Sequence, residues 1–192
     1  MRLSSVLKTI LFFEIALYQP LHAGSPKFAI ATVDPIATNA GTKTLMNGGN
    51  AFDAAVAAAL TLGIVNGYNS GIGGGCFIIG RKSNGEIFVI NGRERAPFKS
   101  NEKMFIRNGK PQGSLSKEGS LSIAVPGALM AYSELSSNHG NIPLKKHLEN
   151  AATIADEGFI ISERFHERIK TSASRLRKYE GSSDVFLNGG GS

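Results

Sequence analysis

Apolar residues recur along this chain with the spacing of helices in five stretches. The most apolar, AFDAAVAAALTLGIV at residues 51–65, is hydrophobic on almost every side, which predicts a helix buried among other elements. Asn50 can cap this helix, and Asp53 places a negative charge in its first turn. The other four helices are predicted over residues 36–46, 128–137, 144–157 and 164–179.

Strand patterns are fewer and shorter. KFAIATV, at residues 27–33, is predicted to be the first strand, and LSIAV, at 121–125, another. Residues 76–79 and 86–91 are apolar runs on either side of an Asn-Gly turn, which predicts a β-hairpin. Because helices and strands interleave and the clear pairing is a hairpin, the fold class is predicted to be α+β, layered rather than doubly wound.

The first 23 residues have the pattern of a secretory signal peptide. Arg2 and Lys8 precede an apolar stretch at residues 10–18, and small or neutral residues lead to a cleavage site after Ala23. Glu14 interrupts the apolar stretch, and the alternative is a cytoplasmic amphipathic start. We expect residues 24–192 to be exported to the periplasm or the extracellular space, with no membrane span in the mature chain.

The chain carries a net charge of +6, and much of its basic excess lies in residues 164–179. A nucleic-acid surface is one interpretation of such a cluster. However, Phe165, Ile169 and Leu176 recur with helical spacing, which indicates an amphipathic helix with a solvated basic face. We therefore predict that the chain does not bind nucleic acid.

The residue types that usually carry catalysis give no nucleophile here. Cys76 is the single cysteine, so neither an intrachain disulfide nor a cysteine-based metal site can form, and we expect a buried structural thiol. His139, His147 and His166 have no metal-ligand spacing and are predicted to lie at the surface. No metal and no cofactor are expected.

The glycine-rich GIGGGC segment, residues 71–76, does not fit a nucleotide-binding motif. Such motifs run from strand to loop to helix, so that a phosphate meets a helix N-terminus. Here a predicted helix precedes the glycines and a predicted strand follows them. The glycines are better explained by a sharp, tightly packed reversal of the chain beside a buried helix.

The position of Arg93, in the segment NGRERAP at residues 91–97, needs an explanation. It follows a predicted strand directly. A guanidinium in a pocket holds a carboxylate with two parallel hydrogen bonds. At the surface it would only pair with Glu94 or Glu86, for ~0–1 kcal/mol. The residues alone leave both interpretations open.

Taken together and in order, several segments resemble the large subunit of the γ-glutamyltransferase (glutathione hydrolase) family. The resemblance extends over residues 27–187, and it departs from the family pattern at Gly67-Tyr68-Asn69, where members often carry a proline-containing segment. The segments that carry it are NAGTKTLMNGGNAFDAAVAAALTLGIV, SGIGGGCF, NGRERAP, NEKMF, AVPGALMAYSEL and HGNIPLKKHLENAATIADEGFIIS.

This resemblance implies an N-terminal-nucleophile hydrolase with an αββα sandwich, made as a precursor that cuts itself into two subunits. The family transfers or hydrolyses γ-glutamyl groups, typically those of glutathione, without a cofactor. The N-terminal threonine of the small subunit is the family's nucleophile. The arginine of its Arg-Glu-x-Ala-Pro segment binds the α-carboxylate of the substrate, and here that arginine is Arg93 rather than Arg95.

The same resemblance implies that catalysis needs residues beyond this chain. Thr153 and Thr171 lie in helical stretches and do not match the family's nucleophile, so the expected partner is the small subunit of the same precursor. We expect the chain to be a fragment or truncated product of the large subunit, inactive alone. The alternatives are a related acylase with the same scaffold and a non-catalytic binding module.

Overall fold

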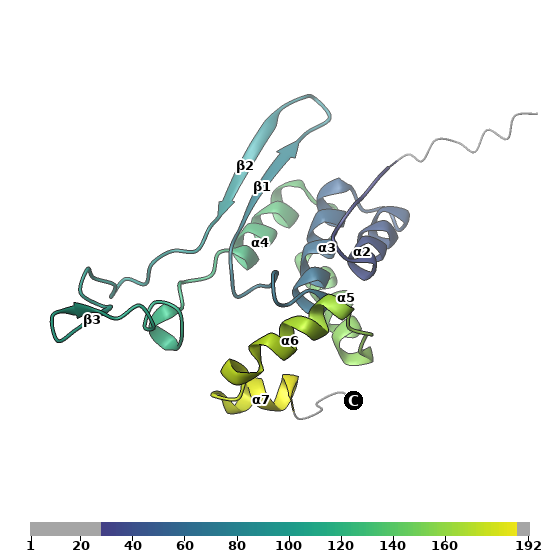
Figure 1. The fold of residues 1–192 in the computed structure, drawn as a ribbon. Coiled ribbons are helices and arrows are strands. Elements are labelled where there is room, and N and C mark those ends of the chain that lie inside the picture. Colours follow the sequence, from purple (N-terminus) through teal and green to yellow (C-terminus); the bar gives the residue numbers. More distant parts are fainter. Residues whose placement is uncertain (1–27, 188–192) are drawn as a thin grey trace, which may run out of the picture.

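The computed structural model describes residues 28–187 and has an α+β fold, as predicted (Figure 1). Figure 1 shows a group of helices, α2 to α5, beside the β1–β2 hairpin, an arm that carries β3, and a separate α6–α7 pair. The predicted signal peptide lies outside the described residues. The main elements are α2 (Pro35–Met46), α3 (Ala51–Val65), β1 (Cys76–Arg81), β2 (Ile87–Gly92), α4 (Ala128–His139), α5 (Leu144–Glu157), α6 (Glu163–Leu176) and α7 (Glu180–Phe186).

Helix α3 is the centre of the packing, and it begins where the sequence predicts. The Asn50 side chain accepts hydrogen bonds from the Phe52 and Asp53 amides, while Asp53 accepts from the Asn50 amide, so the two residues form a reciprocal cap. Val56 and Leu60 are buried in the main core. The alanines of α3 allow α2 to approach closely, and a Cβ at Gly41 of α2 would lie only 3.2 Å from the Ala54 carbonyl oxygen.

The predicted hairpin is confirmed. β1 and β2 pair antiparallel with Cys76 opposite Gly92 and Ile78 opposite Ile90, and the turn contains Gly85 at φ 90°. One face of the hairpin packs against α4 through Ile78, Phe88 and Ile90. The other face is apolar and uncovered, with Phe77, Ile79, Ile87 and Val89 each between 64% and 76% exposed.

Both of the other predicted strands are wrong. Within the described part of the chain, residues 28–33 form no strand; Ile30 instead lies against Gly41 of α2. No other strand lies alongside this segment, and β structure needs such a neighbour. Residues 121–125 contain part of a 3-10 turn, η1 (Ser120–Ser122), and a single bridge between Val125 and Arg95.

Three further elements, β3, β4 and α7, were not predicted. β3 (Ile106–Arg107) and β4 (Lys110–Pro111) form a small hairpin in the exposed arm, around a turn in which Asn108 and Gly109 have φ of 52° and 71°. Helix α7 follows α6 and packs against it. None of the helices between residues 28 and 187 is long and apolar enough to cross a membrane.

Asp53 and His147 form a buried pair that fixes α3 against α5. The Asp53 carboxylate accepts hydrogen bonds from the amides of Asn141 and Ile142, at 3.0–3.1 Å, in addition to the one from Asn50. Its Oδ1 lies 3.5 Å from His147 Nε2. Burial raises the pKa of Asp53, but these hydrogen bonds together lower it below the ordinary value of 3.8.

The prediction that all three histidines lie at the surface is therefore wrong for His147, which is 1% exposed. It lies one helical turn before Ala151, on the face of α5 that packs against α3. His139 is half-buried, and its ring stacks on Phe88 at 4.0 Å between centroids. His166 is exposed, as predicted.

We predict that Asp53→Asn lowers the free energy of unfolding by about 2–3 kcal/mol, because the amide cannot replace a charged acceptor of three backbone N–H groups. Urea unfolding followed by circular dichroism measures this change. Asp156→Asn is the matched control, since Asp156 is exposed on α5, and should change stability by less than about 0.5 kcal/mol. Equal losses in the two variants would contradict the central role of Asp53.

We also predict that this contribution depends on pH. The folded-state pKa of Asp53 lies below that of the unfolded chain, so its contribution is complete above about pH 4 and is lost as the pH falls through the folded pKa. The difference in unfolding free energy between wild type and Asp53→Asn should therefore be constant from pH 7 to pH 5 and shrink below pH 4. A difference that grows on acidification would contradict this assignment.

Candidate functional site

A cleft of about 650 Å³ lies where the glycine-rich loop connects α3 to β1. It is lined by the last turns of α3, by loop residues 67–71 and 73–75, by Cys76 at the start of β1, by Glu94 just after β2, and by Tyr132 of α4. Elements far apart in the sequence therefore meet at one end of the hairpin.

At Gly75 the loop passes so close to its neighbours that glycine is required. A Cβ at Gly75 would lie 2.7 Å from Glu94 Oε2 and 2.7 Å from the Gly92 carbonyl oxygen. Gly74 lies less close to the same carboxylate, since a Cβ at Gly74 would be 3.5 Å from Glu94 Oε1. The prediction of a tightly packed reversal is confirmed at Gly75, where the Glu94 side chain lies against the backbone of the loop, but not at Gly71 or Gly73, where a Cβ would meet no atom within 4 Å.

The start of α4 locks this arrangement. The amides of Gly127 and Ala128 both donate to the Gly74 carbonyl oxygen at 3.1 Å. Arg95 and Val125 exchange two backbone hydrogen bonds, at 3.1 and 2.8 Å, and so hold the segment after β2 beside the segment before α4. The backbone just after Glu94 is thus fixed to the segment before α4, and the glycine loop is fixed to the start of α4.

Arg93 pairs with Glu94, which lines the cleft, but Arg93 itself is not among the lining residues. The distance from Arg93 Nη1 to Glu94 Oε2 is 3.3 Å, and the arginine side chain is 68% exposed. Glu86, the other candidate partner, pairs with Lys82 at 2.9 Å instead. Apart from Arg93, the buried Glu94 Oε2 atom has no polar partner among the described residues. The single ion pair leaves most of the guanidinium's donors facing solvent.

Cys76 is half-buried rather than fully buried, and its thiol faces Tyr132. Burial raises the pKa of Cys76; the Tyr132 hydroxyl lowers it in part, and the Glu94 charge raises it further. Burial also raises the pKa of Tyr132. The thiol is therefore protonated at neutral pH and is not an activated nucleophile. Between residues 28 and 187, no group of three or more potential ligands could hold a metal ion.

Sequence reasoning identified Arg93 and the glycines but did not foresee that Glu94 and Tyr132 line the same cleft. The recurrence of glycine at positions 75, 92 and 127 is the signal that could have indicated it. Each of these glycines permits a backbone-to-backbone approach around one point, since a Cβ at Gly127 would lie 2.5 Å from the Gly92 carbonyl oxygen.

Helices pack on one face of an antiparallel hairpin, with a glycine loop and an Arg–Glu pair at its end, and these elements form one side of a layered α+β fold. A family profile described as gamma-glutamyltranspeptidase matches residues 37–192. The chain belongs to the γ-glutamyltranspeptidase family, as the sequence motifs predict.

Known relatives agree with this assignment. The chain is 38% identical over 162 residues to glutathione hydrolase 2 of Arabidopsis thaliana, covering 84% of this chain and 27% of the relative. It is 34% identical over 163 residues to the glutathione hydrolase proenzyme of Escherichia coli strain K12, covering 84% and 28%. The crystal structure of Helicobacter pylori gamma-glutamyltranspeptidase aligns with a TM-score of 0.80 at 34% identity, covering 83% of this chain and 46% of that one. The chain thus spans about a quarter of the length of these two curated relatives.

We predict that Gly75→Ala destabilises the fold by about 1–3 kcal/mol and displaces Glu94, because the new methyl group would overlap its carboxylate and the Gly92 carbonyl. Gly73→Ala is a matched control in the same loop, since a Cβ there meets no atom within 4 Å. Thermal unfolding of both variants measures the difference. Equal melting temperatures would show that the loop is not packed as described.

Proposed function

We propose that this chain supplies the large-subunit side of the substrate site of an enzyme that transfers or hydrolyses γ-glutamyl groups, and that Arg93 binds the α-carboxylate of the γ-glutamyl substrate. The observation that carries the proposal is the ion pair between Arg93 and Glu94, the latter a residue that lines the cleft. Glu94 is held by the loop backbone and holds Arg93 in turn, while the remaining donors of the guanidinium are free for a ligand.

The chemistry of a guanidinium suits this role. Its planar fork matches a carboxylate with two charge-assisted hydrogen bonds, which fixes the orientation of the bound group as well as its position. In the proposed enzyme, Arg93 holds the glutamyl end while the N-terminal threonine of the small subunit attacks the γ-carbonyl carbon, releases the amine, and passes the acyl group to water or to an amino acid.

The proposed partner is the small subunit, which comes from the same precursor and completes the sandwich. The support from this structure is the uncovered apolar face of the hairpin, formed by Phe77, Ile79, Ile87 and Val89. A second sheet packed on this face would bury four large side chains that now face solvent. We also propose that the protein is exported, on the pattern of residues 1–23.

The test is turnover of γ-glutamyl p-nitroanilide by the protein that combines this chain with its small subunit. We predict that Arg93→Ala lowers kcat/KM by about 100-fold or more, and that Arg93→Lys recovers only part of it, because a lysine cannot form the two-pronged contact. Arg95→Ala is the matched control. Val125 forms hydrogen bonds only with the backbone of Arg95, which the substitution keeps, so activity should stay within about twofold.

A substrate without the carboxylate separates this function from that of an acylase. Butyryl p-nitroanilide has the same chain and the same leaving group but lacks the α-amine and the α-carboxylate. A γ-glutamyl enzyme should leave it intact. If both anilides are cleaved at rates that Arg93→Ala does not change, the proposal is rejected in favour of an acylase. If a γ-glutamyl compound binds but neither anilide is cleaved, a non-catalytic module is favoured.

A further inference from the structure

A cavity of about 690 Å³, which we call the helix cavity, lies between α2, α3 and α5. Helix α3 packs against both of the other helices, and the three lie together in Figure 1. Of the residues described, none lines both the helix cavity and the cleft at the glycine-rich loop. The volume falls in the range of small-molecule sites, roughly 300–1,000 Å³. The helix cavity is therefore a candidate site separate from the cleft beside Glu94.

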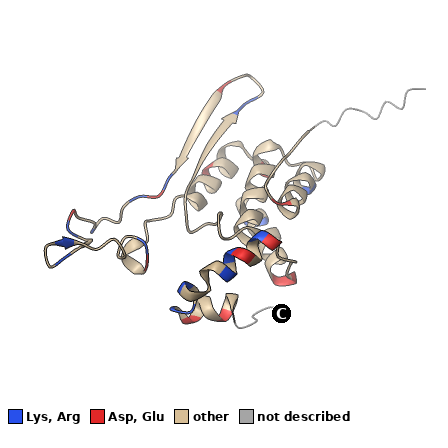
Figure 2. Cartoon of the chain, viewed as in Figure 1, with Lys and Arg blue, Asp and Glu red and all other residues tan. Residues whose placement is uncertain are grey.

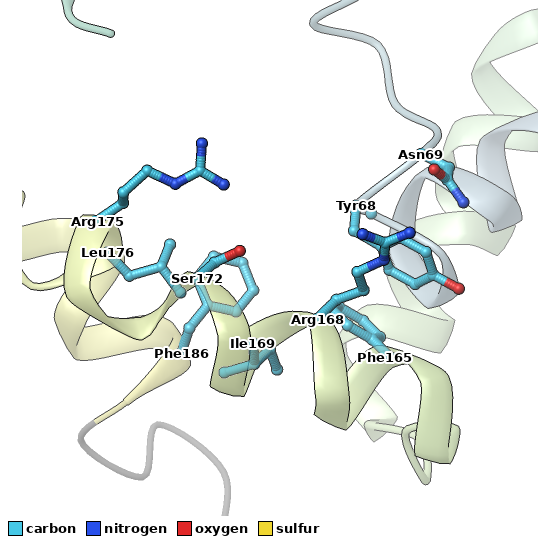
Figure 3. Close-up of a pocket in the computed structure, with 10 residues that line it drawn as sticks. Tyr68, Asn69, Phe165, Arg168, Ile169, Ser172, Arg175, Leu176 and Phe186 are labelled. Carbon is cyan, nitrogen blue, oxygen red and sulfur yellow. The ribbon is translucent and has the colours of Figure 1, made fainter.

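A smaller pocket, of about 370 Å³, lies between the loop at residues 67–69 and the α6–α7 pair and is built differently (Figure 3). Its charged side chains, those of Arg168 and Arg175, are exposed, and Figure 2 shows other cationic residues along the same helix. None of the polar side chains that the structure describes along its wall is buried. Such groups are already solvated, so they do not point to a ligand.

The wall of the helix cavity, in contrast, contains a buried histidine without hydrogen bonds. His147 is 1% exposed, and neither of its ring nitrogens has a hydrogen-bond partner among the residues that the structure describes. Asp53 Oδ1 lies 3.5 Å from His147 Nε2, but this oxygen already accepts from the amides of Asn141 and Ile142. A buried polar group without a partner is destabilising, so it indicates a group that the cavity would hold.

The Asp53 carboxylate determines which nitrogen of His147 needs a partner. In the neutral imidazole, one ring nitrogen carries the proton and the other is an acceptor. The proton belongs on Nε2, because an unprotonated Nε2 would direct its lone pair at the Asp53 oxygen. His147 Nδ1 is then a buried acceptor that needs a hydrogen-bond donor.

Two buried hydroxyl groups on the same wall are also acceptors. Thr44 donates its hydroxyl hydrogen to the Ala40 carbonyl oxygen at 2.9 Å, and Thr61 donates to the Ala57 carbonyl oxygen at 2.8 Å. Thr44 is 8% exposed and Thr61 is 1% exposed. Each hydroxyl oxygen keeps lone pairs for a further donor. The buried polar atoms of the helix cavity therefore fit a ligand that donates several hydrogen bonds.

The exposed residues of the helix cavity favour an uncharged ligand. They include two cations, Lys43 and Lys146, and one anion, Glu157, so a cationic amine is disfavoured although it could donate to the buried acceptors. The exposed amides of Asn39 and Asn47 each donate and accept hydrogen bonds. Hydroxyl groups satisfy both parts of the site, because they donate to the buried acceptors and accept from the amides.

We propose that the helix cavity binds a small uncharged polyol, either a sugar or a linear polyalcohol, whose hydroxyl groups donate to His147 Nδ1 and to the hydroxyl oxygens of Thr44 and Thr61. The site is independent of the proposed γ-glutamyl site, since the described residues that line the two differ. A bound polyol would connect α2, α3 and α5 and would stabilise the folded protein by mass action.

The experiment measures the binding of D-glucose and of glycerol to the full protein by ligand-observed NMR titration. Wild type should bind at least one of them, and the one that binds more tightly shows whether a cyclic or a linear polyol fits. Thr61→Val keeps the shape of the side chain and should weaken binding about tenfold through loss of one hydrogen bond. Thr42→Val is the matched control, because the Thr42 hydroxyl makes the same kind of bond, to the Thr38 carbonyl oxygen, but does not line the cavity.

Two further measurements test the direction of the hydrogen bonds. His147→Phe keeps a ring in the wall without its nitrogens and should also weaken binding about tenfold; if this variant does not fold, Thr61→Val decides. The fully O-methylated form of the polyol that binds keeps its oxygens but has no donor, and it should not bind. The inference is overturned if neither polyol binds wild type, if Thr61→Val binds as tightly as Thr42→Val, or if the methylated compound binds as well as its parent.

Discussion

A single buried carboxylate, that of Asp53, sets the relative positions of the helices. It accepts amide hydrogens from the start of α3 and from the turn that leads into α5, and it lies against His147 of α5. The approach is so close that residue 140 must be glycine, since a Cβ there would lie 2.5 Å from Asp53 Oδ1. A buried charge is stable only when such donors surround it, so the fold cannot relax around this point without a large cost.

Helix α4 connects the residues around Asp53 to the candidate site. Its C-terminal end is tied to α3 by the hydrogen bond from Asn50 Nδ2 to the His139 carbonyl oxygen, at 2.7 Å. Its N-terminal end donates to the Gly74 carbonyl oxygen, about 18 Å away for a helix of 12 residues. A rigid helix therefore joins the Asp53 cluster to the glycine loop, and the loop in turn seats Glu94 beside Arg93.

Local patterns were sufficient for most of the helices and for the hairpin. The Asn50 cap, the apolar run of α3 and the Asn-Gly turn are each encoded within a few residues, and all three are confirmed. The strand predicted over 27–33 failed because a strand depends on its neighbour rather than on its own residues. The seating of Glu94 on Gly75 and the burial of His147 depend on contacts between distant segments, which a single sequence does not display. Arg93 was selected by resemblance rather than by physical pattern, and its role as a substrate clamp stays a prediction.

The exposure of Arg93 limits how strongly the proposed site can bind a carboxylate. An arginine that is 68% exposed is screened by water, and an ion pair there contributes at most about 1 kcal/mol. The same contact strengthens severalfold where water is excluded. The uncovered apolar face of the hairpin, at Phe77 and Val89, leads directly into the segment that carries Arg93. In the proposed enzyme, the sheet that covers this face would also exclude water from the guanidinium. Strong binding of the glutamyl carboxylate by Arg93 would then depend on assembly of the sandwich.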